Sequence, residues 1–351
     1  MINRFANQKP NKDPAYSGKG YADLISIVQV QCPNCNREHI LEGQSILLQD
    51  NSVSICKGCG HRYLIRSHIK NKFELSDIKH ITRSIGVCIS KGGVGKTTTA
   101  VNLSAGLARA GYKVLLIDTD TQGQDSYALG IKQPKMGLSE FLRDKPSIKE
   151  ASIMARENLW LLSGGKSLSS IKRMIDQKDY GGEMVLSEAL MPLENNFDYI
   201  VIDTSPGWDP IAINVLFYVN EVLTPISLHA MSLQGLMEFL KSLSSIQKYR
   251  KDVSLRYVLP TVFDNNVYSQ IKMLKKLKQL YGEILCPPVR YDPCLAISPA
   301  FGKTIFEYAP KSASAIDYKK LIQKVTADNG FQKFGAERRS PAGSALKVFQ
   351  G

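Results

Sequence analysis

Short apolar runs alternate with helical patterns along most of the chain. Five runs have the length and continuous hydrophobicity of strands buried on both faces: residues 84–90, 113–118, 199–203, 222–226 and 255–262. Apolar residues at helical spacing predict helices at residues 97–110, 182–191, 232–250, 267–281 and 314–325. Strands that alternate with helices form a mostly parallel, twisted sheet with helices on both faces. We therefore predict an α/β domain over residues 84–330.

The chain changes character on either side of this domain. Residues 1–20 are rich in Asn, Lys, Pro and Gly, and residues 331–351 combine Gly, Pro and Ser with paired arginines. Such segments bury little apolar surface, so we expect a flexible tail at each end, the second of them basic. Residues 21–67 contain four of the seven cysteines, and the polar residues 68–83 predict a connector to the α/β domain.

Two Cys-x-x-Cys pairs lie in residues 21–67. Cys32 and Cys35 form the first pair and Cys56 and Cys59 the second, with twenty residues between the pairs. Four cysteines at this spacing are typical of a zinc ribbon, in which thiolates fill all four positions around a structural Zn²⁺ ion. The metal would supply folding free energy that a module of about 45 residues cannot obtain from its own core. Iron binding and a redox dithiol pair remain alternatives. Two roles of the ribbon remain open: it recognises a protein or nucleic acid, or it serves as a folding spacer or dimer adaptor.

A glycine-rich loop follows the first predicted strand. Residues 90–99 read SKGGVGKTTT and lie between a predicted strand and a predicted helix, which is the context of a phosphate-binding P-loop. Its glycines would aim backbone N–H groups at phosphate oxygens, Lys96 would contact the β- and γ-phosphates, and the Thr97 hydroxyl would coordinate Mg²⁺. The expected nucleotide contacts in this loop are Gly92, Gly93, Val94, Gly95, Lys96, Thr97 and Thr98. The α/β domain is therefore predicted to be a P-loop NTPase, although Ser90 replaces the usual first glycine and Lys91 is an additional lysine.

The loop resembles the deviant Walker A motif of the ParA/MinD family of ATPases. The resemblance implies that Lys91 reaches across a dimer to the nucleotide of the other protomer and acts in catalysis together with Lys96. Residues 114–130 resemble the second motif of the family, which typically reads D-x-D-P-Q-G-N. This match implies that Asp118 lies near the metal and that Asp120 orients the attacking water.

Two later segments extend the resemblance. The segment FDYIVIDTSPG resembles a Walker B motif, which implies that Asp203 joins Thr97 and Asp118 at the Mg²⁺ ion. The segment PTVFD resembles one that flanks the adenine, which implies nucleotide contacts for Pro260 and Thr261. The departures from the family pattern are Thr121, Gln124 and Ser205.

The resemblance implies a Mg²⁺-dependent ATPase with slow intrinsic turnover, which alternates between ATP and ADP. ATP would join two protomers into a homodimer, and the dimer would bind DNA without sequence preference. A ParB-like or other partner that carries the cargo would stimulate hydrolysis and release the dimer. The cargo would be a plasmid, a chromosome region or a protein assembly.

Charge adds candidate DNA contacts. The chain has 45 Lys and Arg against 32 Asp and Glu, a net charge of +13 that is spread along its length and favours attraction to a polyanion. Lys272, Lys275 and Lys276 share one face of a predicted helix. Arg290 resembles a family arginine implicated in DNA binding, and Lys303 matches a Gly-Lys pair of the family. We expect all five side chains to contact phosphates rather than bases.

Two other functions fit parts of the sequence. One is a zinc-ribbon DNA-binding transcriptional or adaptor protein that is gated by ATP, and the other is a MinD-like membrane-associated positioning ATPase. Residues 331–351 contain Pro and Gly and lack the apolar face of a membrane-binding helix, so we expect no membrane partner. The N-terminal residues lack the apolar core of a signal peptide, which predicts a cytoplasmic protein, associated with the nucleoid through its DNA binding.

Overall fold

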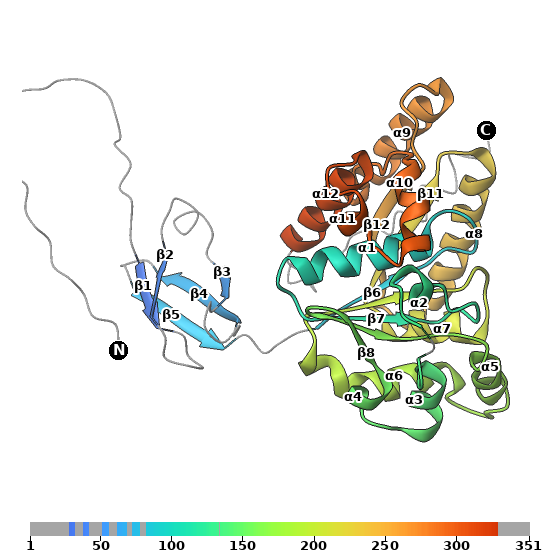
Figure 1. Ribbon diagram of the computed structural model, residues 1–351, viewed down its shortest axis with the longest axis horizontal. Helices are drawn as coiled ribbons and strands as arrows, with labels where there is room; N and C mark the ends of the chain where they lie inside the picture. Colours follow the sequence, from blue (N-terminus) through green and yellow to red (C-terminus); the bar gives the residue numbers. More distant parts are fainter. Residues whose placement is uncertain are drawn as a thin grey trace, which may run out of the picture. The chain divides into compact units, whose positions relative to one another are not determined.

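The structure is a computed structural model (Figure 1). It describes residues 82–328, except residue 133, and five upstream strands. The chain divides into two units, Met1–Ile81 and Thr82–Gly351. The boundary lies two residues before the predicted start of the α/β domain. The two predicted tails and all four cysteines of the predicted ribbon lie outside the described residues.

The first unit contains two small antiparallel sheets. In one, β1 (Val28–Gln31) pairs with β2 (Glu38–Leu41), and in the other β4 (Arg62–His68) lies between β3 (Asn51–Ile55) and β5 (Lys72–Asp77). Strand β5 lies inside residues 68–83, the segment that the sequence predicts as a polar connector. The alternation of apolar and polar residues in KFELSD suits a strand with one covered face.

The second unit is built on a seven-stranded sheet in the order β12-β11-β6-β10-β7-β9-β8. Its strands are β6 (Arg83–Val87), β7 (Val114–Asp118), β8 (Ile153–Arg156), β9 (Leu159–Leu162), β10 (Tyr199–Asp203), β11 (Glu221–Ser227) and β12 (Ser254–Thr261). All neighbours pair in parallel except β8 and β9, which pair antiparallel at one edge. The structure therefore confirms the predicted mostly parallel α/β sheet and its five predicted strands.

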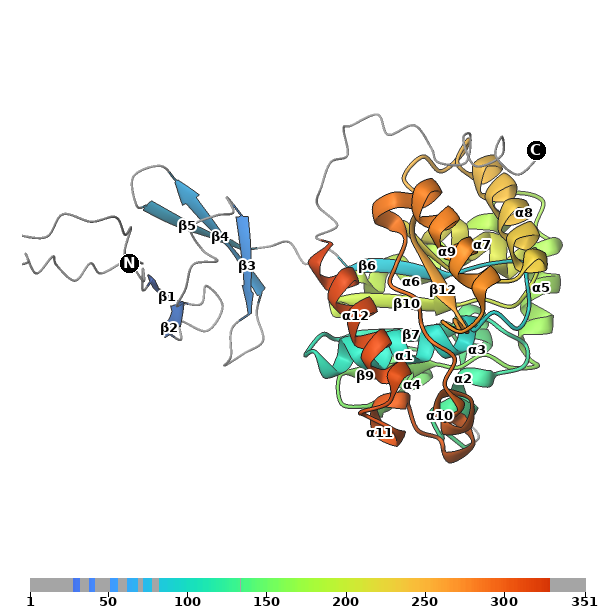
Figure 2. The ribbon, with the colours of Figure 1, turned by 90° about the horizontal axis from the view of Figure 1, so that it is seen from above.

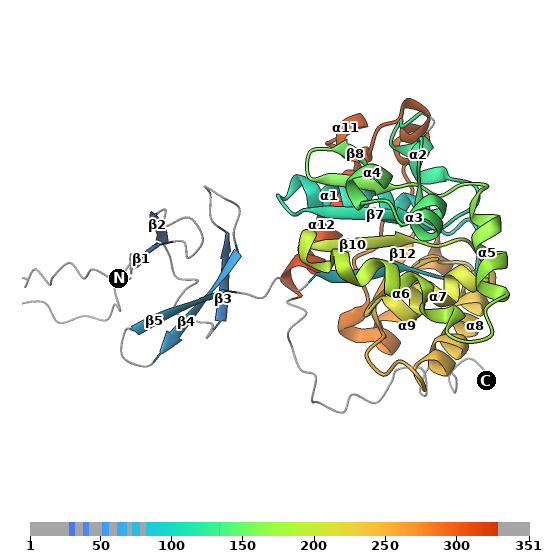
Figure 3. The same ribbon diagram turned by 90° about the horizontal axis from the view of Figure 1, so that it is seen from below.

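Helices cover both faces of this sheet (Figures 2 and 3). One hydrophobic layer includes α1 (Lys96–Arg109), α11 (Ile305–Tyr308) and α12 (Ala313–Ala327). The other includes α3 (Leu138–Asp144), α5 (Leu168–Asp176), α6 (Val185–Leu190), α7 (Pro210–Tyr218), α8 (Ala230–Ile246) and the apolar side of α9 (Tyr268–Tyr281). Because successive side chains of a strand point to opposite faces, Leu115 and Ile117 of β7 enter the second layer and Leu116 enters the first.

Shorter elements complete the unit. They are α2 (Gln124–Ala128), α4 (Ile148–Ala151), α10 (Pro293–Ile297) and the 3₁₀ turns η1 (Gly182–Met184), η2 (Met191–Asn196), η3 (Gly282–Ile284) and η4 (Ser298–Phe301). Within the described part of the chain, no helix has both the length and the apolar character needed to cross a membrane.

Candidate nucleotide and cation site

The glycine-rich loop connects the end of β6 to the start of α1. Gly93 and Gly95 have φ values of 72° and 86°, in the left-handed region that favours glycine. Lys96 is the first residue of α1, so the loop ends at the positive end of a 14-residue helix. The backbone and the helix dipole therefore form the anion-binding arrangement that the sequence predicts.

A cavity of about 500 Å³ lies beside this loop. Two further segments reach it, the end of β12 with Thr261 and Val262, and residues 289–296 around α10. Its lining includes Gly92, Gly93, Gly95, Lys96, Thr97, Thr98, Asp120, Thr204 and Tyr318. The volume falls in the range of about 300–1,000 Å³ that is typical of small-molecule sites. Sequence reasoning did not anticipate that residues 289–296 form one wall.

The two remaining predicted nucleotide contacts lie just behind this surface. Val94 is buried, and its carbonyl accepts a hydrogen bond from the Thr261 hydroxyl at 2.9 Å. Pro260 belongs to β12, where its carbonyl accepts from the backbone N–H of Val289 at 2.8 Å. Val94 and Pro260 thus support the loop and the wall, while Thr261 lines the cavity itself.

The two loop lysines lie in different surroundings. The Lys96 ammonium donates to the carbonyl of Lys91 at 3.0 Å, and burial lowers its pKa below the usual value. Lys91 is not among the residues that line the cavity, although both lysines lie in the described part of the chain. A Cβ atom added to Gly235 of α8 would lie 3.1 Å from the Lys91 Cβ atom, so the stem of Lys91 lies against this helix.

Two predicted acidic residues end adjacent parallel strands. Asp118 of β7 lies opposite Asp203 of β10 in the register of the sheet. The Thr97 hydroxyl donates to Asp203 Oδ2 at 2.7 Å, which brings two of the predicted magnesium ligands together. Burial raises the pKa of Asp118 to about 7, and burial together with the nearby Asp118 raises the pKa of Asp203 to about 8.

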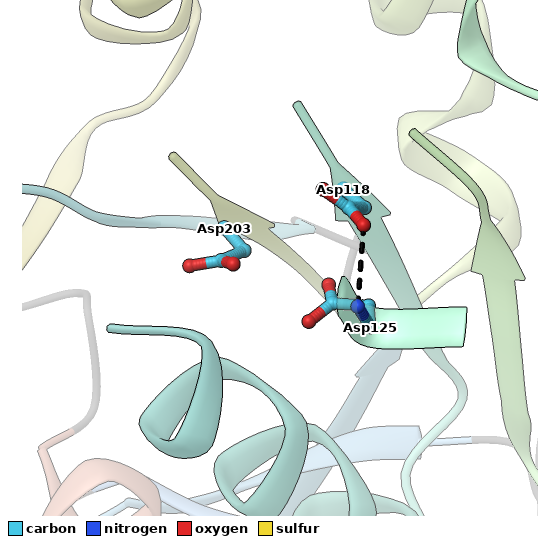
Figure 4. Close-up of side chains that lie close together, drawn as sticks. All are labelled: Asp118, Asp125 and Asp203. Atoms are coloured by element: carbon cyan, nitrogen blue, oxygen red, sulfur yellow. Dashed lines mark hydrogen bonds between the residues drawn. The ribbon is translucent and has the colours of Figure 1, made fainter. Parts of the chain in front are cut away.

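Sequence reasoning missed a third carboxylate at this edge of the sheet. Asp125, in the first turn of α2, lies beside Asp118 and Asp203 (Figure 4). Its backbone N–H donates to Asp118 Oδ2 at 3.3 Å, and its exposed fraction is 0%. An acidic residue in the first turn of a helix is common at protein surfaces, so the sequence carries no signal that this one is buried.

The loop that follows β9 also contributes, and the sequence did not indicate it. A Cβ atom added to Gly164 would lie 2.8 Å from Asp118 Oδ1 and 2.6 Å from the carbonyl oxygen of Asp120. The backbone N–H of Gly165 donates to the same carbonyl at 3.0 Å. Only a residue without a side chain at position 164 permits this contact, which fixes the Asp118–Asp120 segment.

The predicted DNA contacts fall into two groups. Lys272 and Lys275 of α9 and Lys303 are exposed, and Lys276 is half-buried. Arg290, in contrast, donates to Asp317 Oδ2 at 2.7 Å and Oδ1 at 2.9 Å and lines the cavity. The pKa of Arg290 is raised by its hydrogen bonds to Asp317, which itself is 2% exposed. Arg290 is therefore already paired with an internal carboxylate.

The residues at this site suit a nucleotide bound with magnesium. The loop offers N–H groups and a lysine to phosphates, and the carboxylates and the Thr97 hydroxyl are the hard oxygen ligands that Mg²⁺ prefers. In the described residues, the buried Asp203 Oδ1 atom has no hydrogen-bond partner, so it is available to a cation. The geometry therefore fits the cofactors that the loop motif predicts.

Comparisons with known proteins agree with a nucleotide-binding site. Residues 82–256 match the protein family described as an AAA domain. The chain is 30% identical over 247 residues to the chromosome-partitioning ATPase Soj of Thermus thermophilus, across 70% of this chain and 96% of that protein. It is 32% identical over 246 residues to the chromosome partitioning protein ParA of Myxococcus xanthus, across 67% of this chain and 85% of that protein.

A solved structure extends the likeness to the fold. The structure of cobyrinic acid a,c-diamide synthase from Mycobacterium smegmatis with bound ADP and magnesium is similar, with a TM-score of 0.62 and 26% identity. The likeness covers 72% of this chain and 97% of that one. It therefore extends over almost the whole of a protein whose structure holds a nucleotide and a magnesium ion.

Proposed function

The chain belongs to the ParA/MinD family of ATPases and is itself an ATPase, and from that premise we propose that it works as a ParA-type positioning switch. ATP joins two protomers, the dimer holds DNA without sequence preference, and a partner protein that carries the cargo triggers hydrolysis. The cargo is a plasmid, a chromosome region or a protein assembly. The action takes place on the nucleoid in the cytoplasm.

The placement of Lys91 carries the dimer proposal. Its side chain lies against α8 at Gly235 and outside the lining of the cavity, while Lys96 occupies the cavity wall. A lysine that starts a phosphate loop without entering its own nucleotide cavity is free to serve the cavity of a second protomer. Positive charge supplied from a partner would tie hydrolysis to dimer formation.

The residues of one protomer divide the remaining work. Thr97, Asp118 and Asp203 hold the magnesium ion, which neutralises phosphate charge when bound. Asp120 lines the cavity and positions the attacking water, and its carbonyl is fixed by the backbone of Gly165. No histidine lines the cavity among the described residues, in keeping with slow turnover in the absence of a partner.

A Lys91→Ala variant tests the dimer directly. We expect the wild type to change from monomer to dimer on addition of Mg²⁺-ATP in light scattering, and the variant to remain a monomer with reduced turnover. Lys149→Ala, on exposed α4 surface, is the matched control and should dimerise normally. Normal ATP-dependent dimerisation and turnover of Lys91→Ala would contradict the proposal.

Exposed lysines of α9 support the DNA proposal. Lys272 and Lys275 lie three residues apart on one side of this helix, while its buried residues Leu277 and Tyr281 face the core. Together with Lys303, and less directly with Lys276 and the paired Arg290, they would contact phosphates. We expect the Lys272→Ala/Lys275→Ala variant to bind two unrelated duplexes more weakly by a similar factor in fluorescence anisotropy, with a smaller dependence on salt. Unchanged affinity for both duplexes would refute a role for α9, and the Lys149→Ala variant again serves as the control.

We also propose that Cys32, Cys35, Cys56 and Cys59 bind one Zn²⁺ ion. The first pair lies in the chain between the antiparallel strands β1 and β2, and the second pair lies between the antiparallel strands β3 and β4. Cysteine pairs between hairpin strands are typical of zinc ribbons.

Metal analysis of the purified protein tests this site. We expect one zinc per chain, lost in Cys32→Ser/Cys56→Ser and kept in Cys294→Ser, which changes a free cysteine of the second unit. Iron in place of zinc, or zinc retained by the double variant, would contradict this assignment.

A further inference from the structure

Asp125 is a buried carboxylate that the loop motif does not require. Neither of its side-chain oxygens has a hydrogen-bond partner in the described residues, and the same is true of Asp203 Oδ1. A fully buried carboxylate without a partner is unfavourable, because it has lost water and gained nothing in exchange. Such a group points to a ligand that would complete its surroundings.

The three carboxylates have the spacing of ligands around one ion. One oxygen from each of Asp118, Asp125 and Asp203 lies within 4.8 Å of the other two (Figure 4). Two oxygens that share an ion at about 2.1–2.4 Å are separated by at most about 4.2–4.8 Å. The observed spacing therefore needs only a small contraction to enclose a divalent cation.

The three backbones are held firmly enough to define such a site. Asp118 and Asp203 end paired strands in the sheet. Asp125 is placed by the turn at Gly123, with a φ of 65°, and by the bond from its own N–H to Asp118. These restraints come from different elements and fix the three points from which the carboxylates extend.

Charge completes the argument. When ionised, the three carboxylates carry three negative charges, and Asp120 adds a fourth nearby. Lys96 supplies one positive charge near Asp203. One divalent cation would offset most of the remaining negative charge, and all-oxygen ligands select a hard ion such as Mg²⁺ or Mn²⁺. A bound proton is the competing explanation for Asp125, and it would leave Asp125 with no part in cation binding.

We propose that Asp125 joins Asp118 and Asp203 in a carboxylate site that binds a hard divalent cation before any nucleotide arrives. The inference uses the site of the proposed function but requires neither dimerisation nor DNA. The protein alone would then hold the cation, and the nucleotide would bind at a site that already contains the metal ion.

Titration of the nucleotide-free full chain with Mn²⁺, followed by electron paramagnetic resonance, tests the proposal. We expect the wild type to bind one Mn²⁺ that Mg²⁺ displaces, and Asp125→Asn to bind it at least tenfold more weakly. Asp176→Asn, an exposed residue of α5, is the control and should match the wild type. Equal Mn²⁺ affinity of Asp125→Asn and the wild type, or no displaceable Mn²⁺ in the wild type, would overturn the proposal.

A second readout protects the test from a folding defect. We expect Mn²⁺ without nucleotide to raise the melting temperature of the wild type and to leave that of Asp125→Ala unchanged. A wild type that gains nothing from Mn²⁺ would overturn the proposal whatever the variants do. Failure of ATP-dependent dimerisation or DNA binding would not affect either result, because both are measured without ATP and DNA.

Discussion

Two groups of buried charged side chains lie at opposite ends of the strands in the seven-stranded sheet. At the amino-terminal edge, Arg83 of β6 donates two hydrogen bonds to the carboxylate of Glu221, at 2.7 and 2.6 Å, and one to the Tyr257 hydroxyl at 2.8 Å. The side chains of Arg83 and Glu221 are only 14% and 10% exposed. In this group each charge meets an opposite charge.

At the carboxyl ends of the strands, negative side chains outnumber positive ones. Asp118, Asp125 and Asp203 lie together, and one lysine, Lys96, is near them. Oxygens of two of the three carboxylates have no partner among the described residues. The comparison teaches that burial alone does not mark a functional site. A charged group that is complete within the protein supports the fold, whereas an incomplete group is completed by what the protein binds.

Removal of Lys96 should give the largest effect. Lys96→Ala deletes the positive charge that meets the phosphates, so we expect kcat to fall by about 10²–10³, equivalent to about 3–4 kcal/mol in the barrier. Phosphate release in Mg²⁺-ATP measures it, with Lys149→Ala as the unaffected control. A loss of kcat of less than about tenfold would mean that ATP hydrolysis does not take place beside Lys96 and the three carboxylates.

A change at the complete group should affect stability instead. Glu221→Gln leaves the buried Arg83 without its opposite charge, so we expect the free energy of unfolding to fall by about 3 kcal/mol. Urea denaturation measures the loss, and the exposed Glu188→Gln should stay within about 0.5 kcal/mol of the wild type. The folded variant should keep the kcat of the wild type, and a large loss of kcat would break the contrast between the two edges.

A side chain added next to the carboxylates should moderately reduce both stability and turnover. Gly164→Ala places a methyl group 2.8 Å from Asp118 Oδ1 and 2.6 Å from the Asp120 carbonyl oxygen, which forces this segment to move. We expect about 2 kcal/mol of lost stability and a lower kcat. Parallel denaturation and turnover measurements check the pair of effects, and a change in stability alone would show that the position of Asp118 is not critical for hydrolysis.

A partly exposed ion pair should give the smallest effect on the free energy of unfolding. Glu307 accepts from Arg156 Nε at 2.6 Å and from the backbone N–H of Thr304 at 2.8 Å, and its side chain is 29% exposed. Gln keeps an acceptor for Thr304, so Glu307→Gln should reduce the free energy of unfolding by only about 0.5 kcal/mol. Thermal unfolding at low and high salt measures it, and a loss as large as that of Glu221→Gln would remove the distinction between buried and exposed pairs.

The central part of the fold was predictable because its strands are buried on both faces. Uninterrupted apolar runs such as VLLID and YIVID cannot be surface strands, and each ends in an acidic residue at the edge of the sheet. The edge strand β8 and its neighbour β9 were missed because each has four residues, too few to establish a period. Helix α7 was missed for the opposite reason, since PIAINVLFY is apolar on nearly all sides.

The site was predictable only where a motif fixes the backbone. The loop glycines, Lys96 and the strand-end carboxylates follow from local spacing in the chain. Asp125 and Gly164 do not, because their roles arise from contacts with Asp118 that the fold creates. The partner of Arg290 lies 27 residues further along the chain, and no local pattern connects the two.

The hydrogen bond between the Lys96 ammonium and the Lys91 carbonyl also has a consequence for timing. A triphosphate that attracts Lys96 competes with this carbonyl for the same proton donors. If a phosphate displaced this bond, the backbone at Lys91 would lose one hydrogen bond, while the contact of its side-chain stem with α8 at Gly235 involves different atoms. Nucleotide binding at Lys96 would therefore change a contact of Lys91, five residues earlier in the same loop.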